Sequence, residues 1–251
     1  MTNIEISGKV ALITGASSGI GSATALRLAK AGVKVGIAAR RADRLEALKT
    51  EIESQGGHAL VLEMDVANKH SVDAGVKALL DAYGAIDIVF NNAGLMPLSN
   101  VEDLLTDEWN QMVDVNLKGV LHVTAAVLPQ LIKQHSGHII NTSSVAGRKL
   151  LGPGFAVYSA TKYAVTAFTE SLRTEVGKKH NIRVTSIQPG AVATELFAQT
   201  SSEEYQAMMA GFAGSLRALD PSDIAETVLF AVQAPAHVNI AELYVVPTEQ
   251  A

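Results

Sequence analysis

The chain has 251 residues, 48% of them hydrophobic and 5% aromatic, with a formal net charge of −5 and no cysteine. The length suits a single α/β domain, the charge gives no reason to expect a nucleic-acid partner, and the lack of cysteine excludes disulfides and thiolate metal sites. The first residues lack the basic and apolar regions of a signal peptide, and no uninterrupted apolar run reaches about 18 residues. We therefore expect a cytoplasmic protein without a membrane partner.

Short apolar runs alternate with helical patterns along the chain. Strands are predicted at 9–15, 33–39, 58–66, 86–92, 138–144, 182–188 and 242–247. Helices are predicted at 19–31, 43–54, from the third strand to about 83, and at 106–134, 157–179 and 221–233. This alternation favours right-handed crossovers and one Rossmann-type, doubly wound parallel sheet of about seven strands, with helices on both faces. Residues 1–251 would form a single domain that binds ligands at the carboxyl ends of its strands.

A glycine-rich turn joins the first strand to the first helix. Its members are Gly15, Ser17, Ser18, Gly19, Ile20 and Gly21, with the spacing G-x-x-x-G-x-G. Glycine lets the backbone approach a pyrophosphate closely, and the free N–H groups of the helix N-terminus favour phosphate. The turn therefore indicates a dinucleotide site, and a purely structural turn is the alternative.

Two arginines follow the second strand. An NAD-preferring fold usually places a carboxylate at this strand end to hold the ribose 2′-hydroxyl, but the chain continues from Ala39 into Arg40 and Arg41. Guanidinium groups suit a 2′-phosphate, which favours NADP(H); a solvated start to the next helix is the alternative. Asp65, at the end of the third strand, is placed either to meet the adenine or to cap a helix.

Tyr158 and Lys162 are four residues apart at the start of a predicted helix and so share one face. A lysine ammonium near a phenol lowers the phenol pKa, and such a tyrosine can transfer a proton at neutral pH. The fifth strand ends at Ser143 and Ser144, so one hydroxyl should point into the crevice at the carboxyl end of the sheet. Asn116 lies midway along the long helix after the fourth strand.

These motifs resemble those of the short-chain dehydrogenase/reductase family. They run in the family's order from Lys9 to about Pro247: TGASSGIG, NNAG, VNLKG, NTSSVAG, YSATK and QPGAVATEL. The resemblance implies an NADPH-dependent enzyme that moves hydride between the nicotinamide and a ketone, aldehyde or secondary alcohol. A non-catalytic nucleotide-sensing protein on the same fold is the alternative, although such proteins typically lose the tyrosine or the lysine.

The resemblance also assigns roles to matching residues. Tyr158 is expected to act as general acid/base, Lys162 to tune its pKa and bind the nicotinamide ribose, and Asn116 to anchor a proton-relay water. Ser144 is expected to hold the substrate oxygen, although it lies fourteen residues before Tyr158, one more than the common spacing. Ser143 is the other possible hydroxyl. Further cofactor contacts are expected at Val66, Asn92, Ala93, Gly94, Pro189, Gly190, Val192 and Thr194.

The remainder of the chain bears on substrate and assembly. Residues 194–215 match the segment that forms a mobile substrate lid in this family, and a plain packing helix is the alternative. The ending APAHVNIAELYVVPTEQ is similar to a branch containing 3-hydroxy-acid (serine-type) dehydrogenases and clavulanate dehydrogenase, and a 3-oxoacyl thioester reductase is the competing identity. The resemblance implies a homo-oligomer, a tetramer or dimer. The scattered histidines show no ligand pattern, so no metal site is expected.

Overall fold

The computed structural model describes residues 4–196, 200–215 and 217–250. Seven parallel strands form one sheet in the order β3-β2-β1-β4-β5-β6-β7. They are β1 (Val10–Thr14), β2 (Lys34–Ala39), β3 (His58–Glu63), β4 (Ile88–Asn91), β5 (Gly137–Thr142), β6 (Ile182–Pro189) and β7 (Glu242–Val245). The predicted α/β Rossmann-type fold is confirmed.

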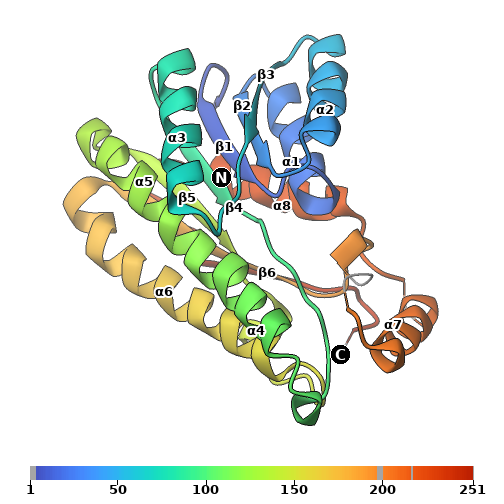
Figure 1. Ribbon diagram of the computed structural model, residues 1–251. Coiled ribbons are helices and arrows are strands. Elements are labelled where there is room, and N and C mark those ends of the chain that lie inside the picture. The colour runs from blue at the N-terminus through green and yellow to red at the C-terminus, as the bar shows by residue number, and fades with distance from the viewer. Residues whose placement is uncertain (1–3, 197–199, 216, 251) are drawn as a thin grey trace.

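Helices cover both faces of the sheet (Figure 1). One face carries α1 (Gly19–Lys30), α2 (Ala42–Ser54) and α8 (Pro221–Val232), and the other carries α3 (Lys69–Tyr83), α5 (Gly119–Gln134) and α6 (Ala156–His180). The short helix α4 (Thr106–Met112) precedes α5, and α7 (Glu203–Ser215) lies to one side, near the C-terminal end of the chain.

Strand residues alternate between two apolar cores because successive side chains point to opposite faces of a sheet. In β1, Ala11 and Ile13 pack against α1, α2 and α8, whereas Val10 and Leu12 pack against α3, α5 and α6. A third apolar cluster joins α4, α6 and α7 and includes Tyr158. The two large cores cover the two faces of the sheet, and the third surrounds Tyr158 near the start of α6.

The helix predicted at 106–134 is interrupted. A π-helical segment, Val113–Lys118, separates α4 from α5. Taken together, Thr106–Gln134 is long and apolar enough to cross a membrane by length and composition, and 39% of its most apolar window is buried. A helix that covers the sheet of a soluble protein meets the same criterion, and α5 packs on α3 and α6 in that way.

The order of the strands places two loops side by side. From β1 the sheet is extended in one direction by β2 and β3, and then in the opposite direction by β4. The parallel strands β1 and β4 are therefore neighbours although β2 and β3 intervene in sequence. The glycine-rich turn follows β1, and Asn92, Ala93 and Gly94 follow β4. This topological switch point is where open α/β sheets bind ligands.

Candidate active site

A cavity of about 810 Å³ opens at the carboxyl ends of the strands. Nearly all the residues predicted for the site line it: Gly15, Ser17, Ser18, Gly19, Ile20, Arg40, Arg41, Asp65, Val66, Asn92, Ala93, Gly94, Ser144, Tyr158, Lys162, Pro189, Gly190, Val192 and Thr194. Gly21 and Asn116 do not line it. The cavity is therefore continuous from the glycine-rich turn to the tyrosine and lysine.

The glycine-rich turn is held against the loop after β4. Gly15 has φ +66°, and a Cβ there would lie 2.9 Å from the Cα of Ala93, so only glycine fits without strain. Thr14, which sequence reasoning missed, accepts hydrogen bonds at Oγ1 from the backbone N–H groups of Asn92 (3.0 Å) and Ala93 (3.1 Å). The side-chain Nδ2 of Asn92 in turn donates to the Thr14 carbonyl at 3.1 Å. Asn92 thus braces the turn in addition to lining the cavity.

Gly21 has a packing role. A Cβ at this position would lie 2.2 Å from the carbonyl oxygen of Gly15, which no side chain can tolerate. Gly19, with φ +55°, lies against Thr194, whose Cγ2 would be 3.0 Å from an added Cβ. The turn is therefore tight, and its outer face is open to the cavity as a pyrophosphate site requires. These features fit a dinucleotide.

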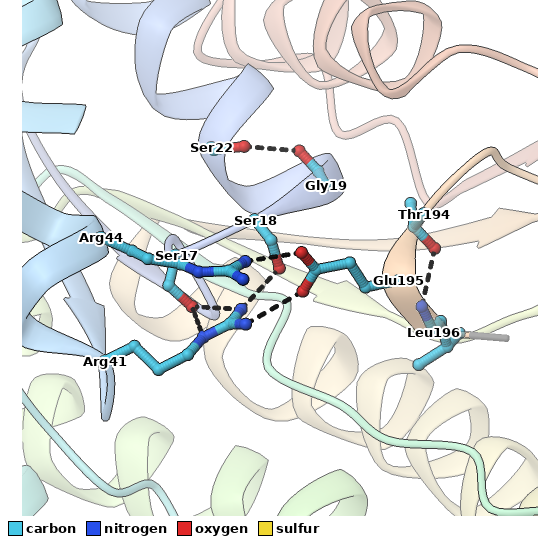
Figure 2. A network of polar contacts seen from close by, with 9 residues as sticks. All are labelled: Ser17, Ser18, Gly19, Ser22, Arg41, Arg44, Thr194, Glu195 and Leu196. Atoms are coloured by element: carbon cyan, nitrogen blue, oxygen red, sulfur yellow. Dashed lines mark hydrogen bonds and ion pairs between the residues drawn. The ribbon is translucent and has the colours of Figure 1, made fainter. Parts of the chain in front are cut away.

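The arginine corner consists of Arg40, Arg41 and Glu195, which line the cavity, and Arg44, which pairs with Glu195. Arg41 donates to the Ser17 hydroxyl through Nε (3.2 Å) and Nη2 (2.9 Å), and to the Ser18 hydroxyl through Nη2 (2.8 Å). Its Nη1 lies 3.0 Å from Oε2 of Glu195 (Figure 2). Arg40 also lines the cavity but has no ion pair within the described part of the chain.

Asp65 does not cap the following helix. Its Oδ1 accepts from the backbone N–H of Ala67 at 3.0 Å, while Asn68 is the N-cap of α3 and accepts from His70 and Ser71. Asp65 lines the cavity two strands away from the glycine-rich turn. Of the two readings of this residue, the one at the cavity agrees with the geometry.

The two serines after β5 point in different directions. Ser144 forms a side-chain hydrogen bond with Tyr158 and also accepts from the backbone N–H of Ala146 at 3.1 Å. Ser143 instead donates to the carbonyl of Lys162 at 2.9 Å and pairs with Thr166 at 2.8 Å, against helix α6. The extra residue between Ser144 and Tyr158 is therefore absorbed by the intervening loop, and Ser144 is the hydroxyl beside the phenol.

Tyr158 and Lys162 are buried on the first turns of α6, and burial governs both pKa values. Burial raises the pKa of Tyr158 to about 12, opposed by the hydrogen bond with Ser144, and lowers the pKa of Lys162 to about 8. The Lys162 Nζ donates to the Thr142 carbonyl at 2.9 Å and lies 5.7 Å from the centre of the Tyr158 ring. Loss of hydration outweighs the hydrogen bond in setting the phenol pKa, and the role of Lys162 in lowering that pKa stays a prediction.

Asn116 lies in the π-helical segment and is fully enclosed. Its Oδ1 accepts from the Leu95 N–H and its Nδ2 donates to the Leu95 carbonyl, both at 2.9 Å. The same Nδ2 donates to Thr161 Oγ1 at 3.2 Å. Asn116 therefore ties the loop after β4 to helix α6 at Thr161, which directly precedes Lys162 and lies three residues after Tyr158.

Apart from Leu196 and Met208, which belong to the segment predicted as a lid, the residues of the apolar end of the cavity were not predicted. This end is lined by Leu95, Met96, Pro97, Val115, Val145, Leu151, Phe155, Leu196 and Met208, with Glu108 and Gln111 as polar members. Met96 could have been suspected because it closely follows the NNAG motif. Residues 197–199 of the predicted lid lie outside the described residues, so a mobile lid stays a prediction. Within the described ranges, no three His, Asp or Glu residues form a metal-binding group.

Comparisons with known proteins identify the family of this chain. The short chain dehydrogenase family model matches residues 9–205. An uncharacterized oxidoreductase of Listeria monocytogenes is 45% identical over 248 residues, covering 98% of this chain and 99% of the relative. A closed form of serine dehydrogenase complexed with NADP+ has a TM-score of 0.89 at 34% identity, covering 96% of each chain.

An alcohol dehydrogenase from the archaeon Thermococcus sibiricus, complexed with 5-hydroxy-NADP, has a TM-score of 0.86 at 32% identity and covers 97% of this chain and 98% of its own. The family match spans the glycine-rich turn, the serine pair, Tyr158 and Lys162. The cavity that these residues line is the one described above. The chain is an oxidoreductase that belongs to the short-chain dehydrogenase family.

Proposed function

We propose that this protein is an NADPH-dependent carbonyl reductase that also catalyses the reverse oxidation of the matching alcohol. The observation that carries the proposal is the hydrogen-bonded pair of Ser144 and Tyr158, with Lys162 on the same helix, in the wall of one cavity that reaches the glycine-rich turn. Proton donor, oxygen-binding hydroxyl and nucleotide site thus line a single space. A ketone or aldehyde oxygen placed between the two hydroxyls would receive two hydrogen bonds.

The protonation states favour carbonyl reduction. Because burial raises the pKa of Tyr158 to about 12, the phenol carries its proton at neutral pH and can donate it to a developing alkoxide. The Ser144 hydroxyl is held by Ala146 N–H and Tyr158, which fixes its position for an incoming oxygen. Lys162 and Asn116 both face Gly94, since a Cβ there would lie 3.7 Å from Nζ and 3.4 Å from Oδ1. We assign proton resupply to this side of the phenol.

NADP(H), when bound, supplies or accepts the hydride. The glycine-rich turn would hold its pyrophosphate, Arg40 and Arg41 its 2′-phosphate and Asp65 its adenine. On the nicotinamide side, the candidates are Asn92, Lys162 and the Pro189–Thr194 stretch. The fit is supported by the open outer face of the turn and by two arginines where NAD-binding folds place a carboxylate. The NADP ligands of the serine and alcohol dehydrogenase structures agree with this preference.

Two observations bear on the substrate class. The C-terminal stretch resembles 3-hydroxy-acid dehydrogenases, and one of the similar solved structures is a serine dehydrogenase. We therefore propose small 3-hydroxy acids and their carbonyl counterparts as the first substrates to test. A panel of ketones with and without a carrier thioester separates this proposal from a 3-oxoacyl thioester reductase.

The decisive test of the reaction is Tyr158→Phe. The substitution removes the transferable proton and leaves the ring, so turnover should fall at least about 100-fold. NADPH affinity, measured by fluorescence titration, should stay close to that of the wild type because the phenol is one contact among many. Normal turnover in this variant would overturn the assignment.

Assembly into a homo-oligomer is part of the proposal. Leu121 on α5 and Tyr163 on α6 are 38% and 39% exposed on the same outer layer of the fold. We propose that both side chains lie in a contact between copies of the chain through the outer faces of these two helices. Light scattering after size exclusion would give the mass directly, and a monomer of 26.4 kDa would contradict this part.

A further inference from the structure

The arginine corner already contains an anion. Glu195, just after Thr194, places Oε2 at 3.0 Å from Nη1 of Arg41 and Oε1 at 2.6 Å from Nη1 of Arg44. Figure 2 shows the carboxylate lying between the two guanidinium groups. Hydrogen bonds from Arg44 and then Arg41 lower the pKa of Glu195 to about 2, so the group is charged at neutral pH. Each of these two ion pairs joins residues that are more than 150 positions apart in sequence.

All three nitrogens of Arg41 are engaged. Nε and Nη2 bind the hydroxyls of Ser17 and Ser18 in the glycine-rich turn, and Nη1 binds Glu195. The two serine partners are neutral, whereas Glu195 brings a full negative charge. A second anion that approaches Arg41 closely must either displace the Glu195 carboxylate or be repelled by its negative charge. Arg40, next in the chain, has no such competitor among the described residues.

We infer that Glu195 is a cofactor-specificity residue, whose carboxylate competes with the 2′-phosphate of NADP(H) for Arg41. The inference rests on the proposed use of the arginine corner for that phosphate. Glu195 lines the same cavity as Arg41 and belongs to the stretch that follows β6, so it is part of the cofactor site. It lowers the preference for a 2′-phosphate. It also lets the arginines keep a partner when a cofactor without that phosphate is present.

The size of the effect follows from exposure. The side chains of Arg41, Arg44 and Glu195 are 42%, 44% and 51% exposed, so water and salt screen the pairs. Exposed ion pairs contribute little free energy. Removing the competing charge should therefore tighten binding of a 2′-phosphate by about two- to fivefold.

The experiment uses two nucleotide fragments with the full-length protein. Adenosine 2′,5′-bisphosphate carries the phosphate in question, and adenosine 5′-monophosphate lacks it. Isothermal titration calorimetry should show that Glu195→Gln binds the bisphosphate about two- to fivefold more tightly than the wild type does. The affinity for the monophosphate should be the same in both proteins. Glu195→Asp, which keeps the charge, should behave like the wild type. Glu226→Gln is the matched control, because it breaks an exposed pair with Arg27 outside the cavity.

A second comparison shows whether Arg41 carries the effect. In an Arg41→Ala background, Glu195→Gln should change bisphosphate affinity less than it does in the wild type. An unchanged or weaker affinity of Glu195→Gln for the bisphosphate overturns the inference. If the wild type and Glu195→Gln both bind the two fragments equally well, the proposed NADP preference fails as well. A wild type that prefers the bisphosphate, with no change in Glu195→Gln, refutes the inference alone.

Discussion

The two ends of the cavity differ in how they hold charge. At the catalytic corner, Ser144, Tyr158 and Lys162 are 8%, 5% and 4% exposed, and burial sets the pKa values of the phenol and the ammonium. At the arginine corner, the side chains are about half exposed and the partner groups set the pKa of Glu195. The proposed chemistry thus lies where water is excluded, and the proposed recognition of charge lies where water screens it. The catalytic corner should be sensitive to the removal of a single hydroxyl group and to pH, and the arginine corner should be sensitive to ionic strength.

After Tyr158→Phe, the largest effect is expected from Ser144. Ser144→Ala removes the hydroxyl beside Tyr158 and should lower kcat about 100-fold, as loss of one oxygen-stabilising donor does. Ser143→Ala is the matched control, since its hydroxyl bonds helix α6 instead. It should leave kcat near normal and cost about 1 kcal/mol of unfolding free energy. Equal losses of kcat in both variants would contradict the assignment of Ser144.

A pH effect should follow from buried Lys162. Its pKa is about 8 in the folded protein against 10.5 in the unfolded chain, so the unfolded state binds more protons between these values. Stability should therefore rise with pH in this window, by about 2 kcal/mol between pH 8 and 10. Urea denaturation of the wild type and Lys162→Met gives the test, because the variant should lack this rise. Parallel stability curves would show that Lys162 is not the source.

Above pH 10 the effect should reverse, and stability should fall as the pH rises. The folded pKa of Tyr158, about 12, exceeds its ordinary value of 10.0, so the folded state holds its proton more tightly. Its contribution to stability is lost as pH rises from 10 towards 12. Tyr158→Phe should flatten this decline, which separates the phenol from the ammonium.

The smallest effect concerns the arginine corner. Arg40→Ala should weaken NADPH binding about tenfold, since a charge-assisted contact to phosphate is lost, and leave NADH binding unchanged. Raising the salt concentration should weaken NADPH binding in the wild type more than in the variant. Fluorescence titration at two ionic strengths measures both. If NADH binds the wild type as tightly as NADPH, the cofactor assignment fails.

The sequence predicted the fold well because its signals are local. Apolar runs located every strand, but several predicted strands extend beyond the observed carboxyl end. The strand predicted at 58–66 ends at Glu63, the one at 86–92 ends at Asn91, and the one at 138–144 ends at Thr142. The excess residues, which include Asp65, Asn92 and Ser144, leave the sheet and line the cavity. A pattern of hydrophobicity cannot separate a strand end from a loop that turns into a binding site.

What the sequence could not predict depends on distant partners. The direction of Ser143 became clear only from its bonds to helix α6. The pairing of Arg41 with Glu195 joins two loops that no local pattern connects. The pKa of Tyr158 depends on how completely the fold removes water, and the four-residue spacing to Lys162 says nothing about that. Most residues that line the cavity could be predicted, and their electrostatic setting could not.

The π-helical segment at Val113–Lys118 also marks a place where the chain length can change. A π-helical turn holds about one residue more than an α-helical turn. Deleting one residue here would let α4 and α5 join as one α-helix, with the residues on either side near their present faces. Gln111 would stay at the cavity and Met112 in the third apolar cluster, but the turn that holds Asn116 would be lost. Homologous chains one residue shorter in this segment should therefore keep the cavity and lose the bonds that Asn116 makes to Leu95 and Thr161.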